Sequence, residues 1–194
     1  MNIILASQSP RRKEILDFFK LDYTVYSSGF DESLIRFEGD PAKYVMKQSL
    51  HKGLSVHSRF KNDLIISADT TVYFDERLYE KPLSEQQARE FLYDLRGQTH
   101  LVYTGITVVY QDAVLQDAQE TKVSFVDATD AEIELYLKAV YPLDKAAGYA
   151  IQGPGSLMIK KIEGCYYNVM GLPVTCLSKL LLRFGVNLWA FAGK

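Results

Sequence analysis

The segment from Ser7 to Arg12 combines residue types that bind phosphate. Ser9 and Pro10 are typical of a helix N-cap and of the first helical position. Free backbone N–H groups at a helix start attract anions, and guanidinium groups bind phosphate oxygens through paired donors. The alternative is a solvated helix end, but each positive charge there opposes the helix dipole by about 0.3–1 kcal/mol. We therefore favour phosphate binding by Arg11 and Arg12.

A second candidate is Asp69, which lies inside the apolar run from Leu64 to Phe74. Such a run predicts an interior strand that is covered on both faces. A buried carboxylate without a partner is costly, so it normally binds a metal, pairs with a cation or moves a proton. The alternative is a carboxylate that caps the strand end where the chain enters a loop. Thr70 beside it could donate a hydroxyl hydrogen bond.

Two further segments offer polar groups to a ligand. Lys81 precedes Pro82, which restricts it to extended geometry and could aim it into a cleft, although most lysines are surface charges. The glycines of segment 145–156 let a ligand approach the backbone, and the amide of Gln152 is suited to reading a base edge. A tight connection between a helix and a strand explains these glycines equally well.

The sequence lacks the motifs of several other kinds of active site. The sequence has neither a Gly-x-x-x-x-Gly-Lys-Ser/Thr loop nor a Gly-x-Ser-x-Gly elbow, and its three histidines lack zinc-site spacing. Serine hydrolases and zinc enzymes are therefore excluded. Cys165 and Cys176 do not form a Cys-x-x-Cys pair, and we expect both to be reduced and buried.

Periodicity and capping signals predict the elements that must position these residues. One expected helix begins at Pro10 and runs to about Lys20, with Ile15, Leu16, Phe18 and Phe19 on its buried face. Other helices are expected at 41–57, from Ser84 to Gly97, from Thr129 to Pro142 and from Pro173 to about Phe184; strands are expected at 3–6, 23–26, 64–74, 101–110, 119–127 and 157–162.

Two details of this pattern bear on the site. Capping boxes are predicted for Ser84 with Gln87 and for Thr129 with Glu132. In the helix at 41–57, Lys52 shares one stripe with Val45, Ser49 and Val56, so it leans toward the apolar side.

Length and composition indicate one globular domain. The chain has 194 residues, of which 47% are hydrophobic and 24% charged, and its net charge is −2. These values predict a single domain over 1–194, with two lobes and no linker. The weak negative charge argues against a nucleic-acid partner. No signal segment or spanning helix is recognisable, so we expect a cytoplasmic protein without a membrane partner.

Seven short motifs follow one another along the chain. They are Leu5–Arg12, Ser67–Val72, Glu80–Pro82, Gly97–His100, Pro142–Ala146, Tyr149–Gly153 and Val169–Pro173. In residue type and order they resemble the Maf family of nucleoside triphosphate pyrophosphatases, and the resemblance covers nearly the whole chain. It implies an α/β fold similar to that of inosine triphosphate pyrophosphatases, with a mixed twisted sheet, flanking helices and two lobes around a cleft.

The resemblance also implies an activity and the residues that perform it. The family hydrolyses nucleoside triphosphates to the monophosphate and pyrophosphate with a divalent metal, here Mg²⁺ or Mn²⁺. By resemblance, the triphosphate is held by Ser7, Arg11, Arg12, Lys52 and Lys81. Glu32 and Asp69 serve the metal and the water, and Asp69 is the proton acceptor. Asp31 and Glu38 lie in the same acidic segment, which leaves the choice of Glu32 open.

Arg11, Thr70 and Gln152 occupy positions that separate the subfamilies. They make the sequence look like the dTTP and UTP type. The 7-methyl-GTP type of the same family is one alternative, although it carries a tryptophan where Arg11 stands and a glutamate where Gln152 stands. A non-enzymatic regulator of cell division is another. The implied partner is a nucleoside triphosphate substrate, and a homodimer is left open.

Overall fold

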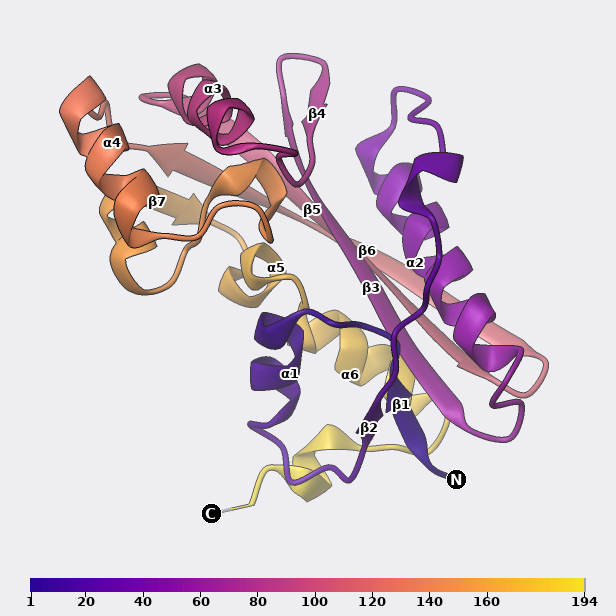
Figure 1. The fold of residues 1–194 in the computed structure, drawn as a ribbon. Helices are drawn as coiled ribbons and strands as arrows, with labels where there is room; N and C mark the ends of the chain where they lie inside the picture. Colours follow the sequence, from indigo (N-terminus) through magenta and orange to yellow (C-terminus); the bar gives the residue numbers. More distant parts are fainter. Residues whose placement is uncertain (194) are drawn as a thin grey trace.

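The computed structural model describes residues 1–193, and a mixed seven-stranded β-sheet organises them (Figure 1). The strands are β1 (Ile3–Leu5), β2 (Thr24–Val25), β3 (Leu64–Phe74), β4 (Arg77–Tyr79), β5 (Thr99–Tyr110), β6 (Ala113–Phe125) and β7 (Ile159–Glu163). Their order is β2-β1-β3-β5-β6-β7, with β4 paired to β3 off this path. β1 is parallel to β2 and β3, and the other pairs are antiparallel. The expected mixed α/β architecture is confirmed.

Six α-helices and four short 3₁₀ turns connect these strands in the described residues. The helices are α1 (Pro10–Leu16), α2 (Pro41–His57), α3 (Glu85–Leu95), α4 (Asp130–Ala139), α5 (Tyr166–Met170) and α6 (Val174–Leu182). The 3₁₀ turns are η1 (Glu32–Leu34), η2 (Ala146–Gly148), η3 (Gly153–Met158) and η4 (Leu188–Phe191).

The sheet is interrupted on one side of β3. β1 pairs with residues 64–66 of β3, and β4 pairs with residues 72–74. Residues 67–71 between them pair with β5 on the other side. The central stretch of a buried strand therefore has an open edge, and Asp69 lies in the middle of it. This position contradicts the alternative that Asp69 caps the strand end.

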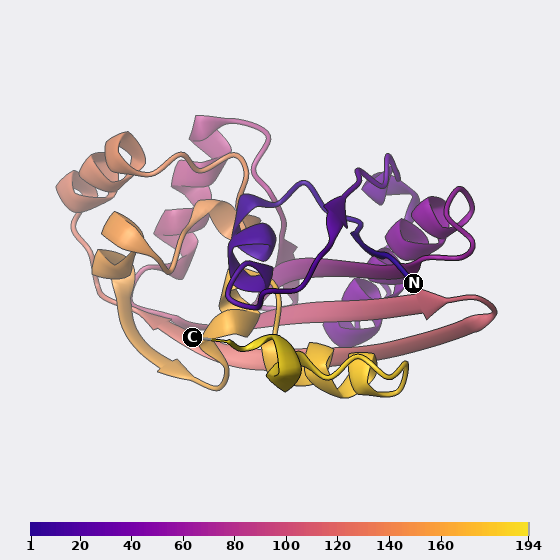
Figure 2. The same ribbon diagram turned by 90° about the horizontal axis from the view of Figure 1, so that it is seen from below.

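Helices α2 and α6 cover opposite faces of the long strands. Successive side chains of a strand point to opposite faces, and Val109 of β5 packs with Val56 of α2, whereas Val108 packs with Leu177 of α6. Figure 2 shows α6 lying along the long strands β5 and β6. α2 approaches very closely at Gly105, where an added Cβ would lie 2.5 Å from the backbone of Val45.

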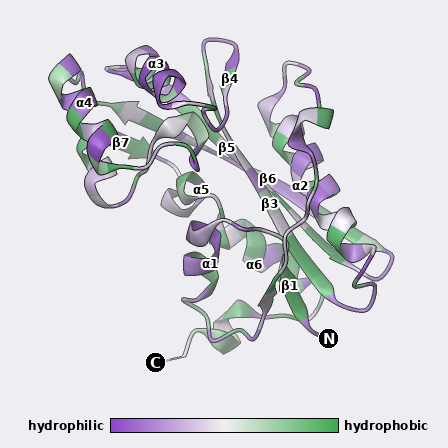
Figure 3. Ribbon diagram, viewed as in Figure 1, coloured by the Kyte–Doolittle hydropathy of each residue, from purple (hydrophilic) through white to green (hydrophobic). Residues whose placement is uncertain are grey.

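Two large hydrophobic clusters lie toward opposite ends of the long strands. One contains residues of α1, α6, β1 and the start of β3. The other contains residues of α3, α4, the end of β3 and the start of β5. Figure 3 shows hydrophobic residues concentrated along β1 and the adjoining end of β3. The interrupted edge of β3 lies between the two clusters.

Most element types were predicted correctly, but some boundaries and contacts were wrong. α1 ends at Leu16 because the following residues form tighter i→i−3 turns, and these turns leave Phe18 half exposed rather than buried. β6 begins at Ala113, six residues before the expected start, because a two-residue hairpin pairs it fully with β5. Cys165 is partly exposed, while Cys176 is buried; both thiols are free, as expected.

The two predicted capping boxes have different outcomes. The box of Thr129 and Glu132 is complete, with side-chain hydrogen bonds in both directions. Ser84 accepts a hydrogen bond from the backbone N–H of Gln87, as predicted, but the Gln87 side chain accepts from Leu83 instead of Ser84. Ser9 stands at the N-cap of α1 without a side-chain capping bond.

Candidate active site

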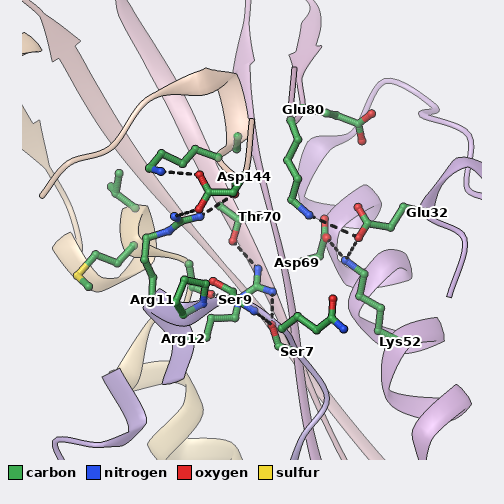
Figure 4. Close-up of a pocket in the computed structure, with 18 of the residues that line it drawn as sticks. Ser7, Ser9, Arg11, Arg12, Glu32, Lys52, Asp69, Thr70, Glu80 and Asp144 are labelled. Atoms are coloured by element: carbon green, nitrogen blue, oxygen red, sulfur yellow. Dashed lines mark hydrogen bonds and ion pairs between the residues drawn. The ribbon is translucent and has the colours of Figure 1, made fainter. Parts of the chain in front are cut away.

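A cavity of about 440 Å³ lies at the interrupted edge of β3. Its walls come from the β1–α1 connection, α2, β3, the segment after β4 and the turn at η2 (Figure 4). Nine of the lining residues are charged. The cations are Arg11, Arg12, Lys52, Lys81 and Lys145, and the carboxylates are Glu32, Asp69, Glu80 and Asp144.

Alternation along β3 divides this lining between two faces of the sheet. Because adjacent strand residues point to opposite faces, Asp69 points toward α2 and Thr70 points toward α1. Asp69 is paired across the strands with Gly105, where α2 comes closest to the sheet. The missing side chain at Gly105 therefore lets α2 bring Lys52 to Asp69.

Lys52 lies between two carboxylates. Its Nζ is 2.6 Å from Asp69 Oδ1 and 2.8 Å from Glu32 Oε1. Lys52 and Asp69 are almost fully buried, whereas the Glu32 side chain is 44% exposed. Burial alone would raise the pKa of Glu32, but the charge and hydrogen bond of Lys52, together with the charges of Lys81 and Arg12, outweigh it and hold that pKa below its ordinary value. Both carboxyl groups are thus held at one ammonium group beside the cavity.

The structure separates Glu32 from the other acids of its segment. Asp31 caps η1 by accepting hydrogen bonds from the backbone and hydroxyl groups of Ser33. Glu38 pairs with Lys47 at the surface, 2.7 Å away. Of these three acids, Glu32 is the one that lines the cavity. Lys81 Nζ is 3.9 Å from Glu32 Oε1 and is well exposed to solvent.

Arg12 is partly buried and connects four parts of the chain. Its guanidinium donates hydrogen bonds to Ser7 Oγ at 3.1 Å, Thr70 Oγ1 at 3.0 Å and the carbonyl of Gly171 at 2.8 Å. Burial lowers the pKa of Arg12, and the negative charge of Asp69 opposes this effect. These contacts fix the Arg12 guanidinium in the cavity wall at the start of α1, a helix of only seven residues.

Thr70 acts as a hydrogen-bond acceptor toward the cavity. Thr104 donates its hydroxyl proton to the carbonyl of Asn168, so the 2.9 Å bond between Thr104 and Thr70 must be donated by Thr70. A threonine has one hydroxyl proton, and that of Thr70 is therefore committed to the interior. In this arrangement the Thr70 oxygen accepts a hydrogen bond from Arg12. Donation from Thr70 to a ligand stays a prediction.

Arg11 crosses the cavity to the segment before η2. It donates to the Asp144 side chain at 3.0 Å and to the Asp144 carbonyl at 2.9 Å. Burial would raise the pKa of Asp144, but Lys145 and Arg11 together lower it. No role was expected for Asp144 from the sequence, although it stands next to a lysine in one of the seven motifs. The partner of Arg11 lies 133 positions away, so no local pattern could identify it.

Gln152 lies beside the cavity lining rather than in it. The adjacent residues Ala150 and Ile151 line the cavity, while the Gln152 side chain donates from Nε2 to Glu14 on α1 at 3.0 Å. This contact joins the glycine-rich segment to the helix that carries both arginines. A role for Gln152 in reading a base stays a prediction.

The candidate site thus combines a buried acid at an open strand edge with several cations, charges that suit a polyanionic ligand. The matching family model is described as "Maf-like protein" and covers residues 2–184. The chain therefore belongs to the Maf family.

Curated relatives align along almost their full length. Proteins named dTTP/UTP pyrophosphatase from Clostridium perfringens and Clostridium tetani are 42% and 43% identical over 97% of this chain and 100% of their own. Among solved structures, the Ham1 protein of Staphylococcus aureus has a TM-score of 0.46 and 14% identity, covering 66% of this chain and 73% of its own. Between residues 1 and 193, none of the helices has the length and apolar character needed to cross a bilayer.

Proposed function

We propose that the chain hydrolyses nucleoside triphosphates, above all dTTP and UTP, to the nucleoside monophosphate and pyrophosphate. The observation that carries this proposal is the cluster of Asp69, Lys52 and Glu32 at the edge of a cation-lined cavity. Support for the choice of substrate comes from relatives above 40% identity that are named dTTP/UTP pyrophosphatase.

The cavity walls supply groups for a triphosphate. Lys81 extends into solvent at the rim of the cavity, where its ammonium group is free to move toward a phosphate. Arg12 presents its guanidinium from the opposite wall. Ser7 Oγ accepts hydrogen bonds from Arg12 and from the backbone N–H of Ser9, which leaves its proton for a phosphate oxygen. Arg11 and Asp144 connect the two walls, so we expect phosphate to compete with Asp144 for Arg11.

The donor set fits a divalent cation of the Mg²⁺ or Mn²⁺ kind that shares its ligands with the substrate. Asp69 and Glu32 would hold it through carboxylate oxygens, which such ions prefer. No group of three or more His, Cys, Asp or Glu side chains suited to a metal occurs in the described part of the chain, so phosphate oxygens and water would complete the coordination. When bound, the cation would neutralise phosphate charge; at 4 Å two unit charges repel by about 4 kcal/mol at an effective dielectric of 20.

Asp69 is the proposed proton acceptor. A water oxygen forms a bond to the α-phosphorus, the bond to the bridging oxygen breaks, and pyrophosphate leaves with that electron pair. The water proton passes to the Asp69 carboxylate, which Lys52 holds in place at 2.6 Å. General-base assistance of this kind typically contributes 10²–10⁴-fold.

Gln152 is the proposed base reader. The N3–H and O4 edge of uracil or thymine offers one donor and one acceptor, which an amide can match. Glu14 accepts a hydrogen bond from the Gln152 amide nitrogen, and this leaves the amide oxygen to accept from N3–H. A 7-methyl-GTP substrate is disfavoured by Arg11 and Gln152, and the names of the relatives favour an enzyme over a non-enzymatic division regulator. We place the reaction in the cytoplasm, a reducing compartment that suits the free thiols.

A nucleotide panel tests the proposal. The purified protein is incubated with each nucleoside triphosphate and Mg²⁺ or Mn²⁺, and pyrophosphate and orthophosphate are measured separately. We expect pyrophosphate as the first product and the highest kcat/KM for dTTP and UTP. Orthophosphate as the first product would contradict attack at the α-phosphorus, and a preference for 7-methyl-GTP would contradict the substrate choice.

A further inference from the structure

Three polar side chains form a stripe along α2 next to the apolar positions of the helix. Tyr44, Gln48 and Lys52 follow one another at intervals of four residues, which places them on one face of the helix. All three are at most 6% exposed. Lys52 binds the Glu32 carboxylate, and Gln48 donates from Nε2 to the Glu32 backbone carbonyl at 2.8 Å. Glu32 is therefore held by α2 at both its backbone and its side chain.

The proton donors of Gln48 and Tyr44 are fully assigned. The Gln48 amide also donates to the Tyr44 hydroxyl at 3.0 Å, so both of its N–H groups are engaged. The Tyr44 hydroxyl in turn donates its proton to the Glu80 carboxylate. Burial and the hydrogen bond to Glu80 raise the pKa of Tyr44, so the phenol keeps this proton. The result is a directed chain from Gln48 through Tyr44 to Glu80.

This chain of hydrogen bonds ends on two segments that bear cavity residues. Glu32 lies in η1, a single turn of three residues with no buried members. Glu80 immediately precedes Lys81, and the backbone carbonyl of Glu80 accepts from Ala147 in η2 at 2.9 Å. α2 therefore contacts both segments beside Asp69, and the Glu80 segment is also continuous with β4, which ends at Tyr79.

The amide oxygen of Gln48 indicates that this side chain serves as a hydrogen-bond donor and not as an acceptor. Its Oε1 is buried and has no hydrogen-bond partner among the described residues. A buried acceptor without a partner opposes folding, and an apolar side chain of equal length would avoid it. The arrangement thus retains an amide at this position although only its N–H groups are used.

We propose that Gln48 and Tyr44 are positioning residues that set the place of Glu32 and of the Glu80–Lys81 segment. This inference rests on the proposed function, because it gives Glu32 and Lys81 their task toward metal and phosphate. Gln48→Met keeps the length of the side chain and removes both donors. We expect it to raise the Mn²⁺ concentration for half-maximal turnover about fivefold, the effect of one lost hydrogen bond, with a smaller change of kcat at saturating Mn²⁺.

Ser49→Ala is the matched control. Ser49 is fully buried on the same helix and bonds the Met46 carbonyl and Thr107, away from Glu32. We expect this variant to lower Tm without changing the Mn²⁺ requirement. An equal shift of the Mn²⁺ requirement in both variants would mean that Gln48 acts only through general stability, and it would overturn the inference.

Hydrogen exchange tests the positioning without any activity. In metal-free protein without nucleotide, we expect the amides of Leu34 and Ile35, which close η1, to exchange at least fivefold faster in Gln48→Met than in the wild type or Ser49→Ala. For Tyr44→Phe, which keeps the ring, we expect faster exchange at Ala147, whose N–H donates to Glu80. Unchanged exchange at these amides would overturn the inference even in an active enzyme. An inactive wild type would refute the proposed function and leave this measurement valid.

Discussion

Replacing Lys52 with methionine removes the positive charge between Glu32 and Asp69. Asp69 Oδ1 and Glu32 Oε1 lie 2.6 and 2.8 Å from the Lys52 Nζ, so these two oxygens are roughly 5 Å apart at most. At about 5 Å and an effective dielectric of 20, two negative charges repel by about 3 kcal/mol. Glu32 is 44% exposed, and solvent screening reduces the repulsion. We therefore expect the free energy of unfolding to fall by about 2 kcal/mol at pH 7.

The pH dependence of the free energy of unfolding distinguishes charge repulsion from a general loss of packing in the variant. In the variant, repulsion raises the folded-state pKa of one carboxyl group, so protonation restores stability as the pH falls toward 5. In the wild type, Lys52 lowers the pKa of Glu32, and this contribution to stability is lost as the pH falls through that lowered value. The two stability curves must therefore converge on acidification.

Urea unfolding at pH 7 and pH 5 measures the effect. Lys47→Met is the control, since Lys47 lies on the same helix and pairs at the surface with Glu38. We expect it to cost less than about 0.5 kcal/mol at both pH values. A Lys52→Met variant that loses the same free energy at pH 5 as at pH 7 would refute the electrostatic account of this cluster.

Three other predictions concern separate residues. Asp69→Asn should abolish turnover while nucleotide still binds in an equilibrium titration; unchanged activity would remove Asp69 from the mechanism. Gln152→Glu should lower kcat/KM for dTTP and UTP, and equal rates would count against Gln152 as a base reader. Burial lowers the pKa of His100 to about 4, so the unfolded chain takes up its proton first and the free energy of unfolding should fall by about 3 kcal/mol between pH 6.5 and pH 4. His100→Gln should flatten this slope, and an unchanged slope would assign it to other groups.

Local signals predicted β3 and α2, which carry site residues, and also α4, which lies outside the site. The apolar run of β3, the proline at the start of α2 and the capping box of α4 each act within a few residues of the chain, and all three elements are present. The burial of Lys52 was also predictable, because helical spacing places it with Val45 and Val56.

The geometry of the site depends on contacts that no local pattern contains. The open edge at Asp69 arises because β1 and β4 pair with different ends of β3. The direction of the Thr70 hydroxyl is set by Thr104, 34 residues away. In the sequence, Gln48 resembles any other polar residue of α2. Its role becomes visible only in the fold, where its amide contacts Glu32. The four-residue spacing of Tyr44, Gln48 and Lys52 was the one sequence signal of this polar stripe. It was missed because the neighbouring apolar positions predicted only a buried helix face.

The central claim is that water attacks the α-phosphorus of a nucleotide held beside Asp69. Hydrolysis of dTTP in ¹⁸O-labelled water, with mass analysis of both products, tests it most directly. The account predicts one ¹⁸O atom in the thymidine monophosphate and none in the pyrophosphate. Label in pyrophosphate or in orthophosphate would place the attack at another phosphorus and would contradict the account.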